Sequence, residues 1–291
     1  MNEIKSFSQL MDSIKGGFAD LSPQFQVGAK YLIDHPDEIA MSSMRAIANN
    51  ANVQSSTLVR FAQHLGFKGW PEFKEIFVNR IRSTPGGYAQ KAKTITKQME
   101  TRDLITEVFE TQQLNIQTTE EKNHATLTIA AKLLESVRHV HVAGFRASYP
   151  IAFSFQYLYR FFRATVYLIS GQAGTLEMGM RAIGKDDGVV VISFAPYSSE
   201  AIVVANAARG KGCKVIAITD SDLSPIALAA SISVVIAVDS PSFFPSIVAG
   251  VATIESLIEL LVSRAGPAAI KQIETAEKQL FEFGAYEKTT S

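Results

Sequence analysis

The stretch from Ile47 to Gly66, IANNANVQSSTLVRFAQHLG, predicts two short helices joined by a tight turn. Ala48 supplies the small side chain that is needed where two such helices cross. Asn52 stands in the turn, and asparagine is the non-glycine residue that best tolerates a left-handed backbone. Val53 and Leu58 offer apolar side chains to the buried face of the second helix. This pattern is typical of a helix-turn-helix, whose second helix enters the major groove of DNA.

The polar residues around this stretch are of the kinds that contact DNA. The first turn of the second helix carries short hydrogen-bonding side chains, which suit base edges in the major groove. Residues 41–71 include three basic side chains and no acidic ones, and phosphate binding requires such a segment. The predicted DNA-contacting residues are Arg45, Gln54, Ser55, Ser56, Thr57, Arg60 and Lys68. The alternative is a pair of ordinary packed helices whose polar face meets only water.

The composition limits the class of protein. A chain of 291 residues is long enough for two domains of about 100–200 residues each. The 28 basic and 28 acidic residues cancel, so a DNA-binding surface must arise from local segregation of charge. The lone cysteine, Cys213, excludes an internal disulfide and favours a reducing compartment. Without a signal peptide or a long apolar stretch, the sequence predicts a cytoplasmic protein with no membrane span.

The pattern along the chain predicts four segments. Residues 1–82 contain short helices and form an all-α helix-turn-helix domain. The run STPGG at 83–87 breaks this pattern, and residues 83–124 are predicted to be a helical connector or dimerisation arm. Over residues 125–266, apolar strands alternate with helices, which predicts a three-layer α/β domain whose parallel sheet has helices on both faces. Residues 267–291 are predicted to form a C-terminal helix and tail.

Two predicted strand-to-helix turns carry hydroxyl groups at helix N-termini. The first contains Arg146 and Ser148, and the second is SFAPYSSE at 193–200. A helix N-terminus offers free N–H groups and a partial positive charge, so it attracts phosphate. Arg146 would add a charged clamp. The alternative is that these serines are ordinary helix caps, and the residues alone leave both interpretations open.

Other candidate sites have less support. His139 and His141 lie on one face of a predicted strand, but no third metal ligand is nearby, so no metal site is predicted. Glu255 lies in a long predicted helix, and we count it among the residues that can face a ligand bound at the two serine turns. No glycine-rich nucleotide-binding motif is present, and no cofactor is predicted.

The two regions together resemble the RpiR/MurR family of bacterial regulators. The segment MSSMRAIANNANVQSSTLVRFAQHLGFKGWPEFK at 41–74 resembles the N-terminal helix-turn-helix of that family. The phrases VVISFAPYSSEA, KVIAITDSDLSPIA and DSPSFFPS resemble parts of a sugar isomerase (SIS) domain. The resemblance implies binding to double-stranded operator DNA and assembly into a dimer or tetramer. It also implies a response to a phosphorylated sugar or a related sugar acid.

The resemblance also implies which residues contact the effector. The family's ligand-contacting positions correspond to Ser148 in the first turn and to Ser193, Ser198 and Ser199 in the second. Many SIS domains have a Ser-x-Ser-Gly-x-Thr/Ser turn, whereas this chain has SFAPYS at 193–198, which narrows the loop. The sequence therefore leaves two alternatives for the group that is bound there, a phosphate and a carboxylate. The full predicted ligand-binding set is Arg146, Ser148, Ser193, Tyr197, Ser198, Ser199 and Glu255.

A second function fits the same α/β domain. It is an aldose–ketose isomerase of phosphosugars that carries an accessory helical domain. Isomerisation needs a base that moves a proton next to a carbonyl, and Glu255 or a histidine would have to serve. No acid–base pair is evident in the sequence, and a helix-turn-helix has no use in such an enzyme. The sequence therefore predicts a regulator with no catalytic residues.

Overall fold

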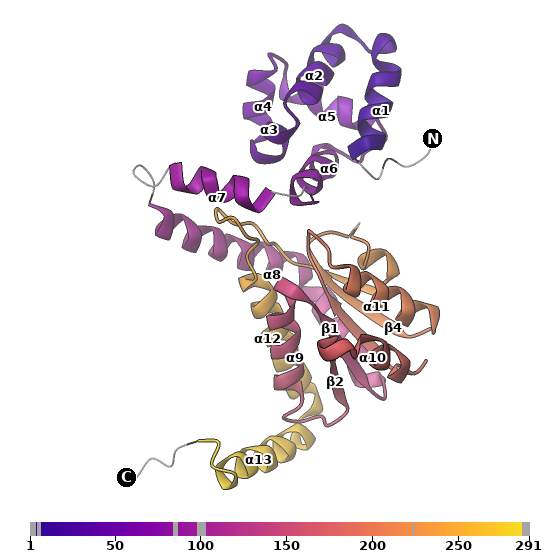
Figure 1. Cartoon of the computed structure of the whole chain (residues 1–291), viewed down its shortest axis with the longest axis vertical. Helices are drawn as coiled ribbons and strands as arrows, with labels where there is room; N and C mark the ends of the chain where they lie inside the picture. Colours follow the sequence, from indigo (N-terminus) through magenta and orange to yellow (C-terminus); the bar gives the residue numbers. More distant parts are fainter. Residues whose placement is uncertain (1–3, 5–6, 84–86, 98–102, 223, 287–291) are drawn as a thin grey trace. The chain divides into compact units, whose positions relative to one another are not determined.

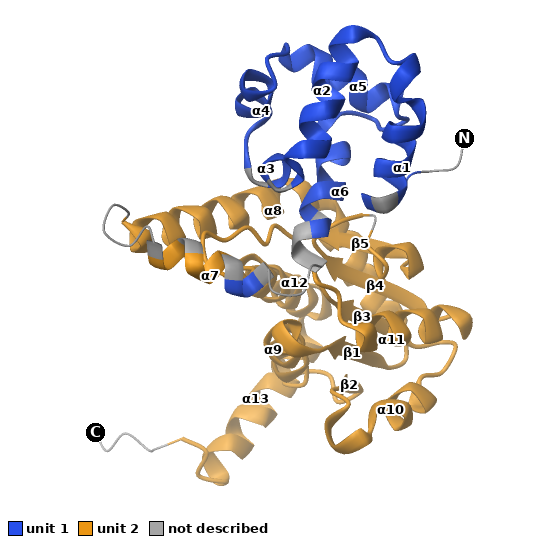
Figure 2. Cartoon of the chain, turned by 45° about the horizontal axis from the view of Figure 1, so that its top comes forward, with its two compact units in different colours: residues 1–90 blue, residues 91–291 orange. Residues whose placement is uncertain are grey.

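The computed structural model describes residues 4, 7–83, 87–97, 103–222 and 224–286. It divides into two compact units, residues 1–90 and 91–291, which Figure 2 colours separately. The division falls within helix α7 (Gly87–Lys97). Three residues of the predicted STPGG break, 84–86, lie outside the described residues.

The first unit is helical (Figure 1). Its elements before α7 are α1 (Phe7–Gly17), η1 (Phe18–Asp20), α2 (Pro23–Asp34), α3 (Pro36–Met41), α4 (Met44–Asn50), α5 (Ser55–His64) and α6 (Trp70–Ser83). One apolar core joins them, and Leu10, Leu32, Leu58, Phe61 and Phe73 are among its buried side chains. Burial of this kind contributes about 1.5–3 kcal/mol for each large side chain, so the core holds the short helices together.

Local signals set several helix boundaries in this unit. Ser22 caps α2 by accepting a hydrogen bond from the Phe25 N–H, and Ser43 caps α4 by accepting one from the Ala46 N–H. His35 separates α2 from the next helix, α3. Pro36 ends α2, but it also starts α3, because a proline suits the first turn of a helix.

The second unit is a three-layer α/β domain, as the sequence predicts. Its sheet contains β1 (Val140–Gly144), β2 (Val166–Ile169), β3 (Gly188–Ile192), β4 (Lys214–Thr219) and β5 (Ile232–Val235). The described strands are all parallel and follow the order β2-β1-β3-β4-β5. The helical elements are α8 (Leu104–Ser136), η2 (Arg146–Ser148), α9 (Tyr149–Tyr159), η3 (Gln172–Gly174), α10 (Leu176–Ala182), α11 (Ser199–Gly210), η4 (Ala227–Ala229), α12 (Val248–Ala265) and α13 (Pro267–Glu282).

Both faces of this sheet are buried, and strand β3 shows how. Val190 and Ile192 belong to a core with residues of α8, α9 and α12. Val189 and Val191 belong to a second core, with residues of α10 and α11 (Figure 1). Successive side chains of a strand point to opposite faces, so a continuous apolar run is what a central parallel strand needs.

Helix α8 differs from its sequence prediction. The sequence predicts a connector that ends at residue 124 and an α/β domain that begins at residue 125. The structure instead has one continuous helix of 33 residues. Asn115, Thr119 and Asn123 lie buried on the part that was assigned to the connector. Such residues read as polar in the sequence, although this half of α8 packs against the α/β domain.

Those three buried side chains cover the open edge of the sheet. The Asn123 amide donates to the Val235 carbonyl at 2.7 Å and accepts from the Val235 N–H at 2.9 Å. Thr119 Oγ1 accepts from the Ala237 N–H, and the Asn115 amide donates to the Asp239 carbonyl. Polar side chains of α8 thus take the place of a further strand beside β5 and the segment after it. Pairing an edge in this way satisfies its backbone groups and blocks association with another chain.

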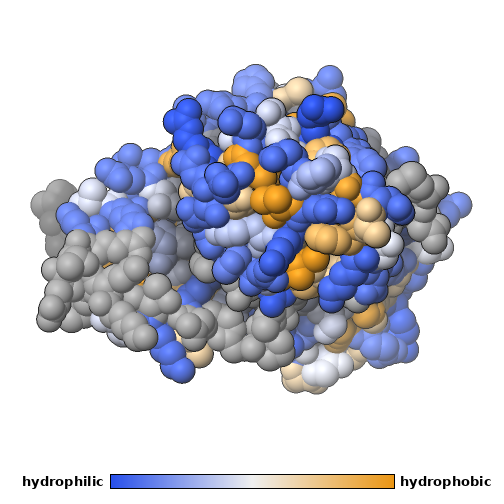
Figure 3. All heavy atoms as spheres, turned by 90° about the horizontal axis from the view of Figure 1, so that it is seen from above, coloured by the Kyte–Doolittle hydropathy of each residue, from blue (hydrophilic) through white to orange (hydrophobic). Residues whose placement is uncertain are grey.

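The face of the molecule in Figure 3 is mostly hydrophilic, with apolar residues scattered among polar ones. Among the described helices, none combines the length and the hydropathy that crossing a bilayer requires.

Candidate DNA-binding helix and ligand site

The turn between α4 and α5 has the geometry that its sequence predicts. Asn52 has φ of 54°, the left-handed conformation that asparagine tolerates. The Val53 N–H donates to the Ala48 carbonyl at 2.9 Å and closes the turn. Ala48 is buried, and Leu58 and Phe61 bury one face of α5. The two helices therefore pack as a helix-turn-helix.

The opposite face of α5 is open to solvent. Ser56 and Arg60 are exposed, while Ser55 and Thr57 are half-buried at the start of the helix. Gln54 is exposed at the N-cap position. Gln63 and His64 are also exposed, at helical spacing from Ser56 and Arg60, but the sequence analysis did not select them. The 3.6-residue period was the signal that would have found them.

The flanking basic residues and nearby carboxylates define the local charge. Arg45 in α4 and Lys68 before α6 are exposed. Glu38 accepts a hydrogen bond from the Asn50 amide, and Glu72 accepts one from the Lys68 N–H. Hydrogen bonds to Glu38, first from Tyr31 and then from Asn50, lower the pKa of its carboxyl. Glu38 and Glu72, the acidic residues closest in sequence to the helix-turn-helix, thus accept hydrogen bonds from other groups of the same unit.

In the second unit, the two predicted serine turns follow the carboxyl ends of two neighbouring strands, β1 and β3. Gly144 at the end of β1 pairs with Ile192 at the end of β3. The chain passes from β1 to β2 on one side and reaches β3 on the other, so the strand order reverses here. Ligands of open parallel sheets bind at such a switch point, outside the carboxyl ends of the strands.

The first turn is built around Gly144. A Cβ at this position would lie 2.7 Å from Ala152 Cβ and 2.8 Å from the Ser148 carbonyl oxygen, so only glycine fits. Arg146 has φ of 53°, and its side chain is 72% exposed. Ser148 is buried at the start of α9, and its side chain makes no capping hydrogen bond there. The turn thus places a basic group and a hydroxyl at a helix start.

The second turn is closed by its own serines. Ser193 Oγ accepts a hydrogen bond from the Ser198 N–H at 3.2 Å, and Ser198 Oγ caps α11 by accepting from the Ala201 N–H at 3.1 Å. Asp220, beyond β4, holds the turn from outside by accepting from the Ala195 N–H at 3.2 Å. Ser198 therefore acts as a helix cap, which was the alternative interpretation. A cap and a ligand donor are compatible, because its hydroxyl hydrogen is not used by the cap.

Glu200, which the sequence analysis did not select, brings the two turns together. Its carboxylate accepts from the hydroxyls of Ser198 and Ser199 at 3.0 and 3.2 Å, and from Arg146 Nη2 at 3.1 Å. The backbone N–H of Glu200 lowers the pKa of this carboxyl most, and the two hydroxyls and Arg146 lower it further against the effect of burial. An acidic residue two positions after a serine cap was the only signal in the sequence.

The remaining predicted ligand-binding residues lie in different surroundings. Ser193 is buried, and Tyr197 is half-buried between the serines of the second turn. Glu255 lies on the exposed side of α12, whose buried side includes Ile254 and Leu257. The structure gathers Arg146, Ser198 and Ser199 around one carboxylate, and Glu255 takes no part in that cluster.

His139 and His141 share a carboxylate. His139 Nδ1 lies 2.9 Å from Asp187 Oδ1, and His141 Nε2 lies 3.0 Å from Asp187 Oδ2. Burial lowers the pKa of His141 against the opposing effect of Asp187. Burial alone would raise the pKa of Asp187, but hydrogen bonds from the Gly184 N–H and from both histidines outweigh it. Throughout the described residues, no group of three or more His, Cys, Asp or Glu is placed to hold a metal ion.

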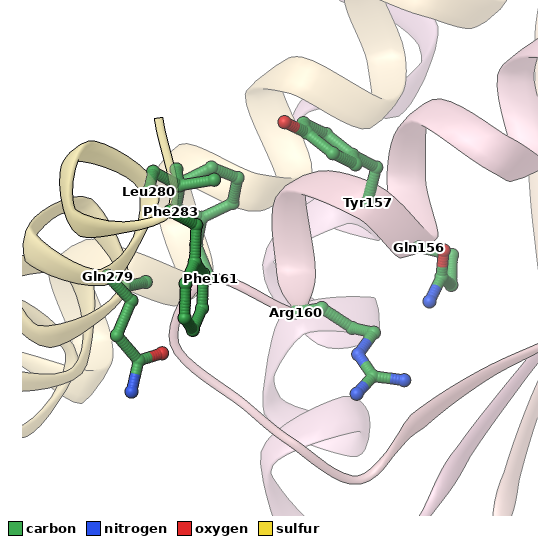
Figure 4. A pocket seen from close by; sticks show the side chains of 8 residues that line it. Gln156, Tyr157, Arg160, Phe161, Gln279, Leu280 and Phe283 are labelled. Atoms are coloured by element: carbon green, nitrogen blue, oxygen red, sulfur yellow. The ribbon is translucent and has the colours of Figure 1, made fainter. Parts of the chain in front are cut away.

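A separate cleft of about 300 Å³ lies between α9 and α13. The side chains of Tyr157 and Phe161 line it from the α9 side, and those of Leu280 and Phe283 from the α13 side (Figure 4). Its lining is mainly apolar, unlike the hydroxyl-rich turns. None of the residues that line this cleft belongs to the predicted ligand set.

Comparison with known proteins extends over both units. A helix-turn-helix domain model of the rpiR family matches residues 10–82, and a SIS domain model matches residues 133–263. The HTH-type transcriptional regulator HexR of Pseudomonas aeruginosa is 26% identical over 226 residues, which are 77% of this chain and 77% of HexR. A bifunctional protein glk of Paraburkholderia xenovorans is 27% identical over 78% of this chain but only 35% of its own length.

Solved structures share the fold. The sugar isomerase domain of an RpiR transcription factor from Sphaerobacter thermophilus has a TM-score of 0.58 and 20% identity, covering 61% of this chain and 99% of that one. The NanR protein of Vibrio vulnificus, complexed with ManNAc-6P, has a TM-score of 0.59 and 16% identity, covering 95% of this chain and 100% of that one. Both domains match, in this order, together with a regulator aligned over most of its length. The chain therefore belongs to the rpiR family of helix-turn-helix transcriptional regulators that carry a SIS domain.

Proposed function

We propose that this regulator binds operator DNA through α5 and is controlled by a phosphorylated sugar, or a related sugar acid, bound at the two serine turns. The main support for the ligand site is that Arg146, Ser198 and Ser199 all donate hydrogen bonds to the carboxylate of Glu200. These donors, together with the start of α11, already bind an anion that belongs to the chain itself. ManNAc-6P in the complex of the similarly folded NanR protein supports a sugar phosphate as the ligand class.

The proposal that the protein binds DNA rests on the exposed face of α5. Base edges would be contacted by the first turn of α5 and Arg60, and phosphates by the flanking basic side chains. The proposed DNA-contacting residues are Arg45, Gln54, Ser55, Ser56, Thr57, Arg60 and Lys68. A ligand changes the DNA affinity only if it binds one conformational or quaternary state better than another. The effector would therefore have to distinguish two states of the SIS domain.

Replacing Arg60 by alanine is expected to weaken DNA binding about tenfold, because a groove contact contributes roughly 1–3 kcal/mol. If Arg60 neutralises a phosphate, the slope of log affinity against log salt should also fall by about one. Fluorescence anisotropy at several salt concentrations would measure both, with a duplex selected from a random library by the wild-type protein. Lys15→Ala, an exposed basic residue on α1, is the control. If Arg60→Ala bound the duplex with unchanged affinity, the assignment of α5 to the major groove would be wrong.

If the two serine turns bind the effector, the effector should stabilise the folded protein. In a panel of sugar phosphates and sugar acids, the effector at a hundred times its Kd should raise the stability of the protein by about 2.7 kcal/mol. The double variant Ser198→Ala, Ser199→Ala should lose this response, since both proposed hydroxyl donors are gone. Thermal shift measurements would show it. Ser198→Thr is the matched control, because threonine keeps the cap and the hydroxyl. A full response in the double variant would place the ligand elsewhere.

We infer that the SIS domain binds its ligand without turnover. Glu255, the base that an isomerase would need, is exposed on α12 and apart from the serine cluster. Similarity to regulators such as HexR supports a non-catalytic role. The bifunctional glk proteins match over only about a third of their length, so their enzymatic activity has no necessary link to the shared part. Incubating the hit from the panel with the protein and analysing it by NMR would reveal any isomerisation.

We also propose that the chain acts in the cytoplasm, where its operator DNA lies, and that it forms a dimer or tetramer. Exposed apolar side chains on α9 and α13 support self-association. Tyr157 is 46% exposed and Phe283 82% exposed, and both side chains line the cleft. Large exposed apolar groups that cluster on neighbouring helices are typical of protein interfaces. A second copy of the chain covering the cleft between α9 and α13 would remove them from water.

A further inference from the structure

Glu200 holds the donors that the proposed ligand needs. One oxygen of its carboxylate, Oε2, accepts from the hydroxyls of Ser198 and Ser199. The other, Oε1, accepts from Arg146 across 54 positions of sequence. The carboxylate also lies in the first turn of α11, where free N–H groups favour an anion. Two hydroxyls, a guanidinium and a helix start therefore surround a negative group of the chain itself.

A phosphate and this carboxylate cannot use the same donors together. A serine hydroxyl has a single hydrogen, and the hydroxyls of Ser198 and Ser199 already direct theirs to Glu200. A phosphate brought to the same place would also face the negative charge of Glu200 at short range. An incoming phosphate must therefore displace the carboxylate from the hydroxyls before it can bind there.

The contacts of Glu200 are poorly explained by a role in stability. The Arg146 side chain is 72% exposed and that of Glu200 is 31% exposed, and ion pairs in such surroundings stabilise a fold very little. Arg146 reaches Glu200 from a left-handed backbone conformation, which is unusual for a residue other than glycine. Strained residues of this kind gather at binding sites and switches.

We propose that Glu200 is an internal competitor of the effector, which occupies the anion site until a phosphate displaces it. This inference rests on the proposed function, in which the two serine turns bind a phosphorylated sugar. It adds a regulatory element, because the first turn then has two states. In one state Arg146 is paired with Glu200, and in the other Arg146 is released to the phosphate of the ligand. Such a difference between states is what coupling to DNA binding requires.

The competition also sets the selectivity of the site. A ligand that displaces the Glu200 carboxylate from the shared donors must carry more negative charge than that carboxylate. This requirement favours a phosphate dianion over a sugar acid. Neutral sugars would leave Glu200 in place. Of the two ligand classes that the residues leave open, phosphates and carboxylates, this competition favours phosphates.

The test is a titration of the full-length protein with two probes, inorganic phosphate and glucose 6-phosphate, by isothermal calorimetry. The variant Glu200→Gln keeps the size and one acceptor oxygen of the side chain but removes the charge. It should bind both probes at least tenfold more tightly than the wild type. Glu177→Gln is the matched control, since Glu177 is an exposed glutamate of the same unit that pairs with Arg181. Its affinities should equal those of the wild type.

Each other outcome overturns the inference in its own way. Equal affinities in Glu200→Gln and wild type would show that no competition occurs, and the proposed function would stand. Weaker binding in Glu200→Gln would make Glu200 a ligand contact. Binding of neither probe by any of the three proteins would overturn the proposed phosphate site as well. If Glu200→Gln fails to fold, Glu200→Asp replaces it, since its shorter side chain withdraws from Arg146 and should give a severalfold gain.

Discussion

Asn123→Leu is expected to lower the free energy of unfolding of the α/β unit by about 3 kcal/mol, the largest loss among the substitutions considered. The Asn123 amide makes three buried hydrogen bonds, to the carbonyls of Thr119 and Val235 and from the Val235 N–H. Leucine has a similar volume but none of these groups. The Val235 N–H and carbonyl would stay buried without partners, and each such group costs about 1–3 kcal/mol.

Urea denaturation followed by far-ultraviolet circular dichroism would measure this loss. Gln117→Leu is the control on the same helix, because Gln117 is exposed and bonds only at the surface, to Glu121. A change within about 0.5 kcal/mol is expected there. If Asn123→Leu were as mild as its control, the edge of β5 would not depend on α8. The variant should also aggregate more readily, since an uncovered strand edge pairs with other chains.

Gly144→Ala is expected to destabilise the same unit by about 2–3 kcal/mol, the range for forcing extra volume into a packed site. The added Cβ would meet Ala152 Cβ at 2.7 Å and the Ser148 carbonyl oxygen at 2.8 Å. Both belong to the start of α9 and its preceding turn, and neither is the flexible end of a side chain. Relief would therefore move the first serine turn away from β1, and ligand binding should weaken together with stability.

Thermal unfolding and the ligand titration would be measured on the same samples. Gly210→Ala is the control, since an added Cβ at Gly210 meets no atom within 4 Å. Its stability should stay the same or rise by about 0.5–1 kcal/mol, because alanine loses less backbone freedom in a helix. Wild-type stability and ligand affinity in Gly144→Ala would show that the turn has room to relax.

The features that could be predicted from the sequence depend on neighbours along the chain. Ser22 and Ser43 cap helices because a cap bonds to an N–H three positions away. Asn52 marks the turn between α4 and α5 through its own backbone preference. The apolar run of β3 announces a central parallel strand, since both faces of such a strand are buried. Each signal lies within a few residues of the structure that it specifies.

The features that escaped prediction depend on residues far apart in sequence. Asn123 reads as a polar connector residue, and only its hydrogen bonds to Val235, 112 positions away, make it part of the α/β core. Glu200 reads as an ordinary first-turn acid until Arg146, 54 positions earlier, contacts it.

The sequence alone therefore determined the two domain types, their order and the turns that carry the candidate site, because short-range patterns encode helices, strands and caps. Only the tertiary structure decided that α8 covers the sheet edge, and that the donors of the two turns meet at one carboxylate. Hydrogen bonds and charges act through space, and the chain's own packing selects which distant partners come within reach.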